Sequence, residues 1–265
     1  MLVALCKHTQ RAVIHVQRRG CASSSATSIA QKLWNDRLKH KSENSTENPS
    51  LPYDATAIKP KSVSESMVQV RYPLTSDELF RKEYLRFDGG LRFGNMLEDM
   101  DAVTGSCAYF HCHDGNPNTK PLHIVTASVS HVSFRRFLPT KRTLFDLTMT
   151  GKIKYVGKSS MLIGVEIAEA GSLRDGSLSG GSLSDGASAG TNQKTIVEAD
   201  FVMVARDTDT GKAAHINPLG NLSEAEQVAF DSGFARIQKE KLDKENHLDT
   251  TVPTEDEIAY IHCGL

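Results

Sequence analysis

The chain has 265 residues, of which 39% are hydrophobic and 24% charged, and its formal net charge is −1. These values are typical of a folded protein of one or two domains, and the balanced charge lacks the clustered cations that binding to nucleic acid requires. No apolar run approaches the roughly 18 residues that a membrane-spanning helix needs. The five cysteines are odd in number and irregularly spaced, which argues against the disulfide framework of a secreted protein.

The N-terminal segment has the composition of a mitochondrial transit peptide. Residues 1–35 contain no Asp or Glu, and Arg18 and Arg19 are followed by the small and hydroxyl residues CASSSATS. An amphipathic start that contains Arg and Ser and lacks acids is typical of mitochondrial targeting. A disordered basic tail is the alternative. We assign residues 1–25 to the transit peptide.

The folded domain is expected to begin near Ser64, after a polar linker or N-terminal extension of residues 26–63. The stretch SMVQVRYPL predicts a short strand that ends at Pro73. The stretch TSDELFRKEYLRF predicts a short helix capped by Thr75 or Ser76.

A long amphipathic helix is predicted to start near Gly94. Its apolar residues recur at helical spacing and form one stripe, which consists of Met96, Met100, Val103, Cys107 and Phe110. Four strands are expected after it, in the stretches HIVTASVSHVSF, LFDLTMTGKIKYVG, SSMLIGVEIAEA and TIVEADFVMVARD. Their alternation of apolar and polar residues favours an antiparallel sheet. The predicted fold is therefore of the α+β class, with a long central helix wrapped by a curved antiparallel β-sheet.

Two segments are expected to lie apart from this domain, which we place at residues 64–220. Residues 171–192 are predicted to form a flexible Gly/Ser insert between the third and fourth strands. A turn at Asp209–Gly211 is expected to lead into a last short strand, and residues 221–265 into a C-terminal helical segment. That segment opens with a capping box of Ser and Glu in the stretch SEAE.

Two stretches resemble ligand-binding motifs but are better explained otherwise. YVGKSS lacks both the spacing and the following helix of a phosphate-binding loop. Cys107, His111, Cys112 and His113 lie close together, but no second cluster completes the four ligands of a structural zinc site. We predict neither a metal site nor a resident cofactor.

Asp101 is the acid of the long helix that invites a chemical role. It lies to one side of the apolar stripe, among the small residues Thr104, Gly105 and Ala108. A carboxylate partly desolvated on such a side would suit a general base, and free N–H groups in the first turn, at Gly94, would favour an oxyanion. From the residues alone, a simple surface acid remains open as well.

Four blocks of the sequence resemble a known family. They read GGLRFGNMLEDMDAVTG, HIVTASVSHVSF, GKIKYVGKSSMLIGVEI and FVMVARDTDTGKAAHINPL. They resemble the mitochondrial acyl-coenzyme A thioesterases that carry two hotdog domains, the thioesterase 9 group. The resemblance implies a hotdog fold and the hydrolysis of acyl-coenzyme A to fatty acid and coenzyme A in the mitochondrial matrix. Coenzyme A would enter only as part of the substrate, and this chain would correspond to the first hotdog half.

The resemblance also implies roles for particular residues. Related hotdog thioesterases place an aspartate on the helix in a G-x6-D-x3-G pattern, which Gly94, Asp101 and Gly105 match. Asp101 would deprotonate the attacking water, and the N–H groups at Gly94 and Asn95 would hold the thioester oxygen. The cations expected to contact the coenzyme phosphates are Arg135, Arg136 and Lys158.

Three functions remain open on the sequence. The first is a working acyl-coenzyme A thioesterase. The second is a truncated, catalytically incomplete half that binds acyl-coenzyme A or a larger partner, and the third, a hotdog hydratase, is disfavoured because no His-centred site is evident. Family sites form where two hotdogs meet, and the asparagine expected of the second half is missing between Glu83 and Phe93. We therefore expect a homodimer or pairing with a second hotdog domain, with weak activity of the isolated chain.

Overall fold

The computed structural model describes residues 28–44, 51, 53, 58–114, 116, 118–170 and 195–245. The predicted transit peptide, the Gly/Ser insert and the last twenty positions of the chain lie outside these residues. The chain divides into two compact units, residues 1–222 and 223–265. Over the described ranges, no helix is both long and apolar enough to cross a membrane.

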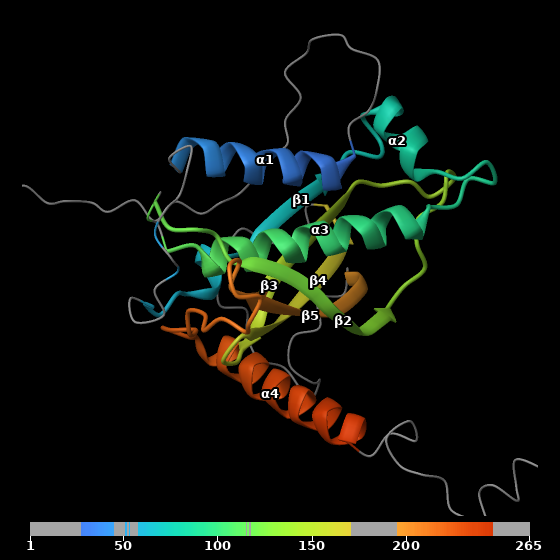
Figure 1. Ribbon diagram of the computed structural model, residues 1–265. Coiled ribbons are helices and arrows are strands. Elements are labelled where there is room, and N and C mark those ends of the chain that lie inside the picture. The colour runs from blue at the N-terminus through green and yellow to red at the C-terminus, as the bar shows by residue number, and fades with distance from the viewer. Residues whose placement is uncertain are drawn as a thin grey trace, which may run out of the picture. The chain divides into compact units, whose positions relative to one another are not determined.

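The first unit contains a five-stranded antiparallel sheet (Figure 1). Its strands are β1 (Val68–Tyr72), β2 (His123–Phe134), β3 (Leu147–Val156), β4 (Ser160–Glu169) and β5 (Thr195–Arg206). They follow one another in the order β1-β3-β4-β5-β2, and every neighbouring pair is antiparallel. The short strand before Pro73 and the four strands after the long helix are therefore confirmed. The order leaves β2 as an edge strand, paired only with β5.

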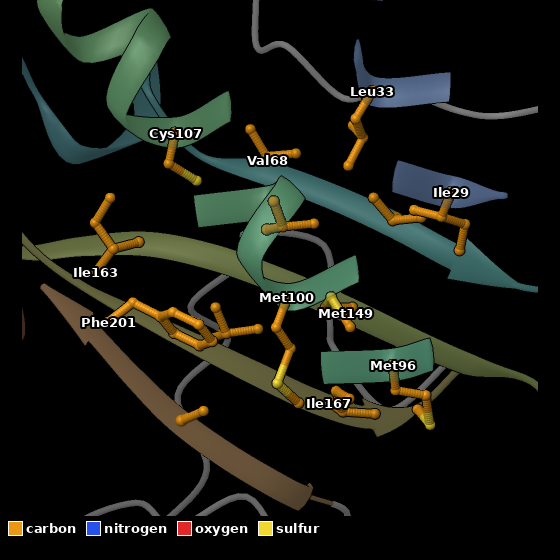
Figure 2. Packing of buried hydrophobic residues seen from close by; sticks show 14 of the residues in the cluster. Ile29, Leu33, Val68, Met96, Met100, Cys107, Met149, Ile163, Ile167 and Phe201 are labelled. Carbon is orange, nitrogen blue, oxygen red and sulfur yellow. The ribbon is translucent and has the colours of Figure 1, made fainter. Parts of the chain in front are cut away.

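The long helix α3 (Phe93–Cys112) lies against all five strands (Figure 1). Its buried stripe consists of Met96, Met100, Val103 and Cys107, each 0% exposed. Figure 2 shows this stripe packed against side chains of the sheet, among them Met149, Ile163, Ile167 and Phe201. A Cβ atom at Gly151 of β3 would lie 2.6 Å from Val103 Cγ1 and 2.8 Å from Cys107 Sγ. Glycine at this position therefore lets the helix approach β3 closely, and the predicted combination of helix and sheet is confirmed.

Helix α1 (Ile29–Asn44) corrects the prediction that residues 26–63 form a linker. It packs alongside α3 (Figure 1). Ile29 and Leu33 are each only 2% exposed and belong to the hydrophobic core. The described fold therefore includes a helix well before Ser64, because two apolar residues one turn apart are enough to bury one side of it.

Two short helices complete the first unit. They are the 3₁₀ helix η1 (Val63–Glu65) and α2 (Glu78–Tyr84). The N-cap of α2 is Asp77, whose side chain accepts a 2.9 Å hydrogen bond from the N–H of Phe80. The prediction of Thr75 or Ser76 as the cap was therefore wrong, because the helix begins later and an Asp serves equally well there.

The segment after β5 forms a turn without the last short strand that the sequence predicts. The N–H of Gly211 donates to the carbonyl of Asp207 at 2.9 Å, which closes the turn. Residues 207–245 contain no further strand. A single bridge between Arg206 and Ala213 is all that pairs there, so the expected strand was wrong.

The second unit contains α4 (Glu224–Glu245). The N–H of Ser223 donates to Glu226 Oε2 at 2.8 Å, and the N–H of Glu226 donates to Ser223 Oγ at 3.4 Å. These reciprocal bonds are the predicted capping box. The helical turn expected near the end of the chain lies outside the described residues.

Candidate functional site

Asp101 projects from the middle of α3 toward the edge strand β2. The hydroxyl of Thr126 donates a 2.6 Å hydrogen bond to Asp101 Oδ1, and both side chains are exposed. The other carboxylate oxygen, Oδ2, has no hydrogen bond to any residue that the structure describes. One oxygen of Asp101 is therefore fixed, while the other can accept a proton or a hydrogen bond from a ligand.

A bulge in β2 places Thr126 at this position. In the pairing with β5, Thr126 lies opposite Met203 and Ser128 lies opposite Val202, so Ala127 is the extra residue. Bulges bend a strand and turn the neighbouring side chains, and they are frequent next to active sites. The sequence analysis did not find Thr126, since it lies 25 residues from Asp101 and a threonine in a strand carries no local signal of such a contact.

The surroundings of Asp101 correct one expectation. The small residues beside it, Thr104, Gly105 and Ala108, are buried. Asp101 itself is exposed, so the partial desolvation expected of it is absent in the single chain. The reason is its direction, because Asp101 faces the open edge at β2 and not the packed side of α3. Desolvation of this carboxylate would need a ligand or another chain.

The start of α3 presents a backbone donor at Gly94. The helix has no side-chain cap, and Gly94 N–H has no acceptor among the described residues. A Cβ atom at Gly94 would meet nothing within 4 Å, so the position is open. Asn95 differs, since its N–H donates to Arg92 O at 3.1 Å and its side-chain amide donates to Glu83 O at 3.1 Å. Of the two predicted donors, Gly94 is the one that remains free to bind an oxyanion.

The three predicted phosphate-binding cations do not gather in one place. Arg135 follows the end of β2 and donates to Glu198 Oε2 from Nε at 3.1 Å and from Nη2 at 2.9 Å. Arg136 is exposed beside it, whereas Lys158 is exposed in the turn between β3 and β4. The strand pairing puts these two places about 20 Å apart, at opposite ends of the sheet.

The end of the sheet that carries the two arginines is also the end where α3 begins. The ring of Phe93, beside Gly94, packs on the ring of Phe134 with centroids 4.8 Å apart. Phe134 directly precedes Arg135. Arg135 and Arg136 are therefore near the free donor of Gly94, and Lys158 is not.

A second acid of α3, Asp99, is buried and bound by other elements of the fold. It is 2% exposed and accepts hydrogen bonds from Tyr72 at 2.8 Å, from Tyr84 at 2.6 Å and from the N–H of Ala30 at 3.0 Å. Burial raises the pKa of Asp99 to about 6, although hydrogen bonds from Tyr84 and Tyr72 oppose this. Asp99 thus joins β1, α2 and the first turn of α1 to α3, which is a structural role.

The cysteines and histidine near the end of α3 are part of the packing. His111 is 0% exposed, with Nε2 at 2.6 Å from Asn217 O and Nδ1 at 3.2 Å from Ser66 Oγ. Burial lowers the pKa of His111 to about 4 and raises the pKa of the thiols of Cys107 and Cys112 to about 12. Among the residues with described placement, no group of three His, Cys, Asp or Glu side chains is arranged to hold a metal ion.

Comparisons with curated proteins give a consistent family. The chain is 30% identical over 213 residues to the chloroplastic acyl-coenzyme A thioesterase 2 of Humulus lupulus, a match that covers 80% of this chain and 45% of that protein. It is 25% identical over 232 residues to the mitochondrial acyl-coenzyme A thioesterase 9 of Mus musculus, which covers 87% of this chain and 48% of that protein. The chain thus spans about half the length of these relatives. No protein-family model matches it.

A solved structure shows the same fold. The acyl-CoA hydrolase from Staphylococcus aureus, determined in complex with butyryl coenzyme A, coenzyme A and coenzyme A disulfide, superposes with a TM-score of 0.52 at 18% identity. The match covers 78% of this chain and 98% of the bacterial one. At this identity the likeness concerns the fold alone. The chain is a homologue of the acyl-coenzyme A thioesterases, and its first unit has the hotdog fold.

Proposed function

We propose that the chain supplies one half of an acyl-coenzyme A thioesterase site, with Asp101 as the general base. The observation that carries this proposal is the exposed Asp101 carboxylate, which Thr126 holds at 2.6 Å through one oxygen only. It occurs in a homologue of acyl-coenzyme A thioesterases. No cofactor is needed in this scheme, because coenzyme A arrives as part of the substrate.

In the proposed reaction, a water molecule next to Asp101 Oδ2 gives a proton to the carboxylate as its oxygen bonds to the thioester carbon. The carbonyl oxygen becomes an oxyanion, which the Gly94 N–H stabilises. The carbon–sulfur bond then breaks, and the coenzyme A thiolate leaves and takes up the proton. Gly94 and Asp101 are seven residues apart, about 10 Å along α3, which leaves room for the carbonyl group and the water between them.

The proposed site needs a second hotdog unit to enclose it. β2 is an edge strand beside Asp101, and edge strands that present apolar side chains tend to pair with another chain. The exposed apolar side chains of β2 are Val129 (46%), Val132 (37%) and Phe134 (53%). We expect a second unit, from another copy or from a complete relative, to pair along β2 and desolvate Asp101.

The test of the proposed reaction is the release of coenzyme A thiol from acyl-coenzyme A. Asp101→Ala should lower turnover by roughly 10²–10⁴, whereas Glu98→Ala, at an exposed neighbour on the same helix, should change it little. If Asp101→Ala and Glu98→Ala retained equal turnover, Asp101 would not be the base.

A second function is favoured by one observation, the match to about half of each relative. In that case the chain is a catalytically incomplete half that binds acyl-coenzyme A or assembles with a larger partner. Binding of coenzyme A thioesters without thiol release, in the presence of a second hotdog half, would identify this function.

The mitochondrial matrix is the proposed location. The acid-free, Arg-containing N-terminal segment supports it, and the mouse relative is named as mitochondrial. Residues 1–40 fused to a soluble reporter should direct it to mitochondria, and replacing Arg11, Arg18 and Arg19 with Glu should leave it in the cytosol. A reporter that stays cytosolic with the native segment would refute the targeting proposal.

A further inference from the structure

Arg37 of α1 is a partly buried cation without a hydrogen-bonded acceptor. Its Nε atom is buried and has no partner, and no other hydrogen bond or ion pair joins its guanidinium to a residue that the structure describes. A guanidinium is always charged and offers five donors, so burying it without an acceptor is costly. Such a group is suited to receive an anion from outside the described chain.

The guanidinium is held in a defined place by its surroundings. Its central carbon lies 5.0 Å from the ring centroid of Trp34, one turn earlier in α1, which is a cation–π distance. It also lies on the backbone of Gly105, where a Cβ atom would come within 3.2 Å of Arg37 Nη1. Gly105, the second glycine of the helix pattern, therefore makes room for Arg37.

This place is directly beside the candidate base. Gly105 follows Asp101 by one helical turn, about 6 Å along α3. Burial lowers the pKa of Arg37, and the negative charge of Asp101 opposes this most strongly. The charged or titratable groups that act on Arg37 are thus Asp101 and Tyr109, both on α3. Neither donates to or accepts from its guanidinium at hydrogen-bonding distance.

The position of Arg37 relates it to one end of the proposed substrate. Gly94 and the arginines after β2 lie toward the start of α3, whereas Arg37 lies on the opposite side of Asp101, toward its end. If the coenzyme phosphates approach from the arginine end, the acyl chain extends from the thioester past Asp101 toward Arg37. An anion that meets Arg37 would then be carried by the acyl group.

We propose that Arg37 binds the terminal carboxylate of a short dicarboxylic acyl group, so that the chain prefers dicarboxylyl-coenzyme A thioesters over uncharged acyl thioesters of equal length. This inference rests on the proposed function and adds its substrate class. Arg37 is a specificity residue in this view, and Asp101 still performs the chemistry.

Two thioether analogues that cannot be hydrolysed provide the test, S-(4-carboxybutyl)-coenzyme A and S-pentyl-coenzyme A. Their affinities for the full chain are measured by titration calorimetry, with coenzyme A as a third ligand. The carboxylated analogue should bind about 10–100-fold more tightly than the pentyl analogue, the range expected for hydrogen bonds to a charged group. Arg37→Met should abolish this ratio without weakening the pentyl analogue, and Arg37→Lys should keep part of it.

Lys32→Met is the matched control, because Lys32 is a cation of the same helix that lies over the ring of Phe80. It should leave the ratio unchanged. The ratio within one sample does not depend on the folded fraction, so partial unfolding of Arg37→Met does not obscure the result. Equal binding of both analogues, or an Arg37→Met effect on coenzyme A itself, would overturn the inference and leave the proposed function standing. Binding of none of the three ligands would overturn both.

Discussion

Asp101 Oδ1 accepts a 2.6 Å hydrogen bond from Thr126 Oγ1, which links the middle of the central helix to the edge strand of the sheet. Both residues are exposed, so the contact contributes little core packing. Its consequence is orientation, because the bond fixes one carboxylate oxygen and directs the other toward the open edge. A base held in this way is prepared for a proton transfer before substrate arrives.

Thr126→Val should therefore weaken catalysis without weakening the fold. Valine preserves the shape of the side chain and removes only the donor to Asp101. We expect kcat to fall roughly 10-fold, at the lower end for a hydrogen bond to a charged group, with an unchanged urea midpoint. Thr208→Val removes a threonine hydroxyl that donates to Pro121 O, and it serves as the control. Equal kcat values for the two variants would show that the Thr126 contact has no role in turnover.

Asp99→Ala should destabilise the fold. It removes the acceptor of two buried tyrosine hydroxyls and of the Ala30 N–H at the start of α1. Buried donors that lose their acceptor each cost about 1–3 kcal/mol, so the free energy of unfolding should fall by roughly 2–5 kcal/mol. Urea denaturation measures this change. Glu98→Ala, next to it on the exposed side of α3, should change stability by less than about 0.5 kcal/mol.

The raised pKa of Asp99 predicts a particular dependence of stability on pH. Because its pKa rises from 3.8 to about 6 on folding, the folded chain binds this proton more tightly than the unfolded chain. The stabilising contribution is full below about pH 4 and is lost as pH rises through about 6. Tyr72 and Tyr84 do not titrate in this window, since burial raises the pKa of both.

Comparison with Asp99→Asn isolates this effect from other titrations. The difference in the free energy of unfolding between the native chain and Asp99→Asn should shift by about 3 kcal/mol between pH 4 and pH 7, against the native chain. Denaturation at a series of pH values measures it. A difference that is constant across this range would mean that Asp99 has an ordinary pKa in the folded chain.

Charging the free edge of the sheet should prevent association. Val132→Lys places a charge on β2, where 37% of the valine is exposed, and lysine on an edge strand opposes pairing with another chain. We expect the variant to be monomeric in sedimentation analysis under conditions in which the native chain is a dimer. Leu79→Lys on α2, at a leucine that is 59% exposed, should stay dimeric. A native chain that is monomeric at all accessible concentrations would contradict a self-paired edge.

The parts of the fold that the sequence predicts are those set by local pattern. The stripe of Met96, Met100, Val103 and Cys107 fixes the buried face of α3, and alternation fixes the strands. Helix α1 was missed because its composition merges with that of a targeting segment, and only Ile29 and Leu33 are buried at 2% exposure. Their partner is α3, which no local window contains.

The site divides in the same way. Gly94 and Asp101 share one helix, so their spacing is visible in the sequence. Thr126 and Arg37 approach that helix from β2 and α1, and only the folded chain brings them together. The predicted set of cations fails to gather for the same reason, since the strand order sends Lys158 and Arg135 to opposite ends of the sheet.

The most direct measurement of the central claim is acyl-coenzyme A hydrolysis by the purified chain without its first 25 residues, assayed alone and with an added second hotdog half from a relative. The claim is that Asp101 is a base that needs a second unit to enclose it. Thiol release should be weak for the chain alone, rise at least 10-fold with the added half, and fall by roughly 10²–10⁴ on Asp101→Ala in the mixture. No stimulation by the second half, together with turnover that survives Asp101→Ala, would contradict the claim.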